Sequence, residues 1–188
     1  PNSTMGTDAL VVLRTLLKPK DAAPANTAAM MYAEAMGLVS VLMGIAKEAV
    51  KAQDPQGQQA LTSFGILELL ASTHSSARAE MRRGDLLDTT IKAVDRLNND
   101  NDIGEAYHKD VAYALEELFM DLLLQLMYEE AELHTAAARE SRAAVAKAVG
   151  VGLIEVLVKT MKRHLSSRFK NNTGLDMVET VCRVLAIL

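Results

Sequence analysis

The chain has 188 residues, a length typical of one compact domain that buries roughly 70% of its unfolded surface. Its hydrophobic content of 49% excludes a disordered chain, and its aromatic content of 4% excludes a nucleic-acid platform built on base stacking. The net charge of −4 gives no general attraction to polyanions, so the bulk composition does not favour a nucleic-acid partner.

The single cysteine leaves no possible internal disulfide and indicates a reducing compartment. No apolar run reaches the length of a bilayer span, because charged residues such as Glu116 and Asp121 interrupt the most hydrophobic stretch. No charged and then apolar leader opens the chain. We therefore expect a cytoplasmic protein without a transmembrane segment.

The N-terminal part differs in composition from the rest. Residues 1–4 precede Met5 and are interpreted as vector residue, and residues 5–36 are predicted to form an N-terminal helical cap or partial repeat. All four prolines fall in the first third of the chain, so nothing after Pro55 is barred from a helix by a missing amide. The remainder of the chain is free to be helical.

Apolar residues recur at steps of three and four, and no period-two alternation of useful length lies between them. Each such set makes one stripe on a helix. The sets are Leu10, Leu13 and Leu17; Leu87, Ile91, Val94 and Leu97; Ile154, Leu157, Met161 and Leu165; and Leu175, Val178, Cys182 and Leu185. The segment 111–128 is apolar on more than one face, which predicts a helix surrounded by others. The predicted fold class is all-α.

An internal repeat is visible when LLDTTIKAVDR, starting at Leu86, is laid on LIEVLVKTMKR, starting at Leu153. Both charged and apolar positions agree, and a weaker third copy, LVSVLMGIAKE, starts at Leu38. The helix after each copy repeats as well, in SFGILELL, VAYALEEL and VCRVLAIL. The copies that start at Leu38 and Leu86 keep one spacing across both helices, which generic amphipathic helices would not do. The sequence therefore predicts a repeat array.

These residues resemble the armadillo family, with HEAT-type helical pairs as the nearest alternative. The best match is the last unit, in which SRAAVAKAVG, GLIEVLVKTMKRH and LDMVETVCRVLAIL resemble the first, second and third helices of a unit. The resemblance implies a right-handed α-solenoid of about three repeats behind an N-terminal capping segment. The repeats are placed at 37–72, at 73–134 with an extended third helix, and at 135–188. The apolar ending VLAIL lacks the polar outer face of a terminal unit, so we expect a fragment of a larger protein.

The resemblance implies a non-catalytic protein-interaction module or scaffold that binds a partner protein on the concave surface lined by third helices. The family's concave positions fall on Tyr113 and Arg183, and on Glu117 in place of the usual asparagine ladder. The other ladder positions are Leu69 and Ile187, so peptide binding in the manner of a nuclear-import adaptor is not implied. We predict partner contacts at Tyr113, Glu117 and Arg183, since tyrosine and arginine are enriched among binding hot spots.

Two other functions compete with this one. A helical-bundle enzyme could use Glu130 and His134, which lie four residues apart, together with carboxylates of the central helix. A catalytic zinc site needs three protein ligands, so we predict no metal, no cofactor and no catalytic residue. The second competitor is binding of acidic lipid or nucleic acid by an acid-free basic run. That run consists of Lys159, Lys162, Arg163, Arg168 and Lys170.

Overall fold

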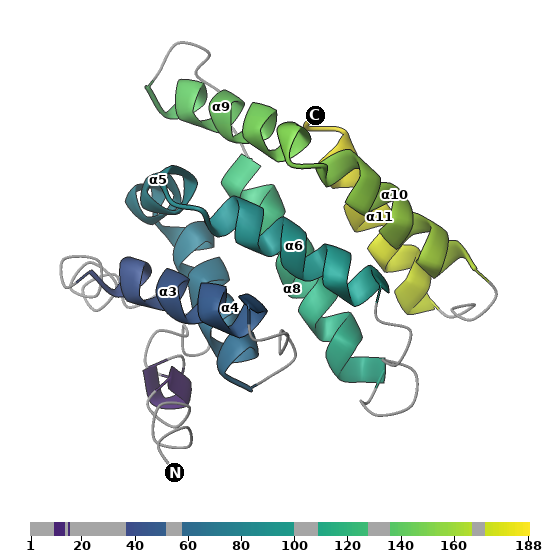
Figure 1. Ribbon diagram of the computed structural model, residues 1–188, viewed down its shortest axis with the longest axis horizontal. Coiled ribbons are helices and arrows are strands. Elements are labelled where there is room, and N and C mark those ends of the chain that lie inside the picture. Colours follow the sequence, from purple (N-terminus) through teal and green to yellow (C-terminus); the bar gives the residue numbers. More distant parts are fainter. Residues whose placement is uncertain are drawn as a thin grey trace. The chain divides into compact units, whose positions relative to one another are not determined.

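The computed structural model describes residues 10–13, 15, 37–51, 58–99, 109–127, 136–166 and 172–188 (Figure 1). These residues form helices joined by turns and include no strand, which confirms the all-α prediction for the described part of the chain. The helices that pack the core are α3 (Leu38–Lys51), α4 (Gln58–Thr73), α5 (Ser75–Arg83), α6 (Leu86–Asn99), α8 (Lys109–Met127), α9 (Ala136–Gly150), α10 (Leu153–Leu165) and α11 (Asn172–Leu185). Of the described helices, none is long and apolar enough to cross a membrane.

The chain divides into two compact units, Pro1–Leu86 and Leu87–Leu188, called here the N-terminal unit and the C-terminal unit. In the N-terminal unit α3 packs against α4 and α5. Its core includes Leu42, Phe64 and Met81, each with no exposed surface. A salt bridge of 2.9 Å joins Lys47 on α3 to Asp85 in the turn that follows α5. All of α6 except its first residue belongs to the C-terminal unit.

Helix α8 lies in the core of the C-terminal unit, as its apolar content predicts. It packs against α9 and α11, and it is buried on more than one side. The buried residues of α8 are Leu115, Glu116, Phe119, Met120, Leu122, Leu123, Leu126 and Met127. The prediction of a helix surrounded by others is therefore confirmed for 115–127.

Helices α6 and α10 lie side by side and run in the same direction. Asn98 Nδ2 on α6 donates hydrogen bonds to the Val156 carbonyl at 3.3 Å and to Thr160 Oγ1 at 2.9 Å. Lys159 Nζ reaches Asp95 Oδ1 at 2.7 Å, and Arg163 Nη1 donates to the Leu97 carbonyl at 2.7 Å. These two helices carry the sequence copies that start at Leu86 and Leu153.

Helices α8 and α11 also pack together in the same direction. Tyr113, early in α8, interacts electrostatically with Asp176, early in α11. Asp121, further along α8, interacts in the same way with Arg183, further along α11. The residue that is later on α8 therefore lies near the residue that is later on α11, so the two helices are parallel. These two helices follow the copies that start at Leu86 and Leu153.

Two predicted apolar stripes lie differently from what their periodicity indicates. On α11 the buried residues are Met177, Val181 and Val184, whereas Leu175 is 64% exposed and Cys182 is exposed. The buried face is therefore rotated by one residue, about 100° around the helix, from the predicted stripe.

On α10 the predicted stripe is divided between two faces. Leu157 is buried, but Ile154 is 45% exposed and Leu165 is 61% exposed. The face that packs inward consists of Leu153, Val156, Leu157, Thr160 and His164. The α6 stripe is buried throughout, at Leu87, Ile91, Val94 and Leu97.

Candidate functional site

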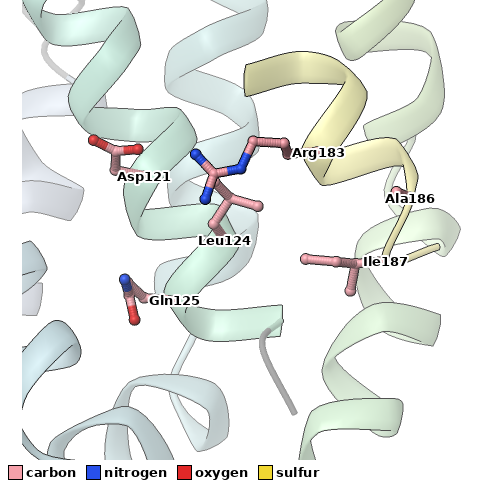
Figure 2. Close-up of a pocket in the computed structure, with 6 residues that line it drawn as sticks. All are labelled: Asp121, Leu124, Gln125, Arg183, Ala186 and Ile187. Atoms are coloured by element: carbon pink, nitrogen blue, oxygen red, sulfur yellow. The ribbon is translucent and has the colours of Figure 1, made fainter. Parts of the chain in front are cut away.

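A groove of about 500 Å³ lies between α8 and α11 (Figure 2). Its α8 side is formed by Asp121, Leu124 and Gln125, and its α11 side by Arg183 and the two residues after the helix, Ala186 and Ile187. The apolar side chains Leu124 and Ile187 lie beside a carboxylate and a guanidinium. This α8–α11 groove therefore combines apolar surface with charges of both signs.

The groove's two charged side chains interact across the gap between the helices. Figure 2 shows the Arg183 guanidinium extending from α11 toward α8, where Asp121 and Leu124 lie. Burial raises the pKa of Asp121, and the positive charge of Arg183 partly offsets that rise. The charged form of Asp121 is thus incompletely compensated, and a further cation or hydrogen-bond donor from a bound partner would stabilise it.

A buried polar cluster connects α8 to α10. Glu116 on α8 is 1% exposed, and its Oε2 lies 2.7 Å from His164 Nε2 and forms an ion pair with Arg163. Through Arg163 the cluster also reaches the Leu97 carbonyl on α6. The arrangement, called here the Glu116 cluster, fixes the position of α8 relative to its neighbours because an unpaired buried carboxylate would be costly.

Tyr113 lies beside the Glu116 cluster and not in the groove. Its ring meets the His164 ring edge to face, with centroids 6.0 Å apart and an interplanar angle of 76°. Burial raises the pKa of the Tyr113 hydroxyl, and the negative charges of Glu117, Asp176 and Glu116 raise it further. The phenol therefore stays neutral well above neutral pH and can act as a hydrogen-bond donor.

The structure separates the three predicted partner contacts. Arg183 lines the α8–α11 groove, together with the predicted ladder position Ile187. Tyr113 and Glu117 lie earlier on α8, and neither is among the lining residues; Glu117 is exposed. The remaining ladder position, Leu69, is on α4 in the N-terminal unit.

The predicted basic run is partly used in internal contacts. Lys159 pairs with Asp95, and Arg163 pairs with Glu116. Lys162 is exposed on α10, while Arg168 and Lys170 lie outside the described residues. Two of the three described cations are therefore already partnered by carboxylates of the same unit.

Sequence reasoning missed Asp121 and Gln125, although a signal for them was present. They continue Tyr113 and Glu117 at four-residue steps along one side of α8, so the predicted contact line extends two turns further. The pairing of Glu116 with His164 had no comparable signal, since the two residues are 48 positions apart in sequence. Glu116 is one of several carboxylates on α8, and nothing in the sequence distinguishes it from its exposed neighbour Glu117.

No cluster of metal-ligating side chains is found in the part of the chain that the structure describes. Glu130 and His134 lie outside that part. No family model, curated protein or solved structure matches the chain.

Proposed function

We propose that the chain is a non-catalytic protein-interaction module of stacked armadillo-like repeats, and that it binds a partner protein in the α8–α11 groove. The observation that carries the proposal is the position of this groove. It lies between α8 and α11, the two helices that resemble third helices, and it includes Arg183, which the resemblance implies is a concave position.

Contacts between equivalent helices support the stacked arrangement. In a repeat array each unit packs against its neighbour, so helices of the same type lie side by side. Asn98 and Asp95 on α6 contact Thr160 and Lys159 on α10, as successive second helices would. The packing of α8 against α11 supplies the same relation for the third helices.

The groove's chemistry favours a peptide segment with an apolar side chain between polar groups. Leu124, Ala186 and Ile187 offer apolar contact, while Arg183 can pair with a carboxylate in two hydrogen bonds. Asp121 can accept a hydrogen bond from the partner's backbone or from a cation. Neither a nucleophile nor a metal is needed for this role.

The test is a selection of random peptides on the wild-type protein, followed by measurement of each affinity by fluorescence anisotropy. We expect Arg183→Glu to weaken binding by about 2 kcal/mol, roughly thirtyfold, because arginine is enriched among binding hot spots. Tyr113→Ala tests whether the contact surface extends along α8.

The matched control is Arg139→Glu, which makes the same charge change at an exposed position of α9. It should leave the affinities within about twofold of wild type, since rim and remote charges contribute little. Peptides that bind the Arg183→Glu and Arg139→Glu variants equally well would contradict the proposed site.

A further inference from the structure

Helix α10 carries an apolar stripe on a side next to its packed face, roughly 110° around the helix. Ile154 is 45% exposed, Val158 38% and Leu165 61%, and Met161 between them is partly exposed. Their spacing alternates steps of three and four, which is the a and d pattern of a coiled-coil seam. A contiguous apolar stripe of this kind is typical of an interaction surface.

The repeat equivalent of this stripe is covered in α6. Leu87, Ile91 and Val94 correspond to Ile154, Val158 and Met161, and they are 0%, 2% and 0% exposed. The same side of the same type of helix is therefore buried in one copy and open in the other. We call the open side the outer stripe of α10, with Ile154, Val158, Met161 and Leu165 as its central residues.

Two opposite charges flank the outer stripe along one edge. Ile154 and Met161 are the d positions of the seam, and Glu155 and Lys162 directly follow them. Both charged residues are exposed. Neither forms an ion pair with another described residue. Lys159, by contrast, points to the α6 side and pairs with Asp95.

The edge charges specify the direction of a pairing helix. In an antiparallel pair of identical helices, equivalent edges face each other, which brings Glu155 of each helix to Lys162 of the other. In a parallel pair this edge would face Leu157 and His164, which are buried in the unit and carry no free charge to match it. The outer stripe is thus complementary to itself in the antiparallel direction.

We propose that the outer stripe of α10 pairs with the same stripe of a second copy of this chain, in an antiparallel, two-fold symmetric dimer. Val158 packs against Met161 of the second copy, and Ile154 against Leu165 of the second copy. Two Glu155–Lys162 pairs form along one edge of the seam. Such an isologous contact is closed, so it produces dimers and not filaments.

The dimer is weak and depends on protein concentration. A seam on one short helix covers less area than the ~1,200 Å² of total surface that a stable interface needs. Equilibrium sedimentation over about two decades of protein concentration is therefore the appropriate measurement. A wild-type protein that is monomeric over the whole range would overturn the proposal.

Charge reversal tests the edge pairs. Lys162→Glu places like charges opposite each other in both edge pairs and should weaken dimerisation about fivefold to tenfold. The double variant Glu155→Lys/Lys162→Glu exchanges the two charges and should restore wild-type affinity. A double variant as weak as the single variant would overturn the antiparallel register, as would an equal loss in the Arg139→Glu control.

Cysteine cross-linking tests the direction independently, in a Cys182→Ser background that removes the native thiol. A mixture of the Ile154→Cys and Leu165→Cys proteins should form a disulfide-linked heterodimer, and neither protein alone should form a dimer. If each protein instead formed a disulfide with a second copy of itself, the two α10 helices would run parallel and the proposal would be overturned. In the antiparallel pair the two identical cysteines are too far apart to react, since Cα atoms more than about 7 Å apart cannot be bridged.

The apolar layer is tested by Val158→Glu, which should abolish dimerisation because it buries two like charges near the symmetry axis. The position is 38% exposed, so the unfolding midpoint of the monomer should stay close to wild type. Unchanged dimerisation in this variant would overturn the assignment of the seam.

Discussion

Glu116 is a buried carboxylate that links α8 to α10 in the C-terminal unit. It is 1% exposed, and its Oε2 is held by His164 and Arg163, while no hydrogen-bond partner for Oε1 is found among the described residues. Removing a carboxylate from water costs several kcal/mol unless its partners compensate for the lost hydration. Each member of the Glu116 cluster would therefore destabilise the folded unit if the other members were removed.

We predict that Glu116→Ala lowers the free energy of unfolding by about 3 kcal/mol, because it leaves His164 and the Arg163 guanidinium without their carboxylate. Urea denaturation followed by circular dichroism measures the change. The neighbouring exposed Glu117→Ala is the control, and it should change the free energy by less than about 0.5 kcal/mol.

The double variant Glu116→Ala/His164→Ala should lose less stability than the two single variants together, with a coupling of about 1–3 kcal/mol. Strict additivity would show that the two side chains do not depend on each other.

At the scale of single elements, the turn between α9 and α10 determines how these helices meet. Gly152 has φ of +93°, the left-handed region that side chains rarely adopt, and its carbonyl accepts the first hydrogen bond of α10 from the Val156 amide at 3.2 Å. The sequence pair Gly150 and Gly152 marks this turn, but only Gly152 needs the glycine backbone. The distinction follows from backbone geometry alone, since an added Cβ would meet no atom within 4 Å at either position.

Gly152→Ala should therefore lower the free energy of unfolding by about 1–2 kcal/mol, owing to the cost of the left-handed conformation. Gly150→Ala is the matched control at the end of α9 and should be neutral or stabilising by up to about 1 kcal/mol. Thermal unfolding of both variants measures the difference, and equal effects of the two substitutions would contradict this account.

At the scale of the whole molecule, the packing is divided between two compact units. In a stacked array each unit depends mainly on its neighbours, so a defect weakens protection close to its position. A single closed core would instead distribute the loss over all helices. A local loss of protection therefore indicates a stacked array, and a loss over all helices indicates a single closed core.

The corresponding prediction uses one core leucine of each unit, Leu42 on α3 and Leu157 on α10, both with no exposed surface. Each leucine-to-alanine substitution should cost about 2–5 kcal/mol. Amide hydrogen exchange should show the loss of protection mainly in α3 and α4 for Leu42→Ala, and mainly in α10 and α11 for Leu157→Ala. Equal loss in both units for either variant would contradict the division.

The sequence by itself determined the helical class and the burial of α8 on more than one side. Both features depend on local periodicity and apolar content, which are properties of the sequence. It did not determine which side of α10 and α11 is buried, because both helices carry apolar residues on more than one side.

Only the tertiary structure brought Glu116 to His164 and placed Asp121 opposite Arg183. The physical reason is that burial and ion pairing depend on the neighbouring helix, and residues that meet across two helices are separated by dozens of positions in the chain. The exposed side of α10 illustrates the same point, since its apolar residues resemble those buried in α6 and differ only in whether another element covers them.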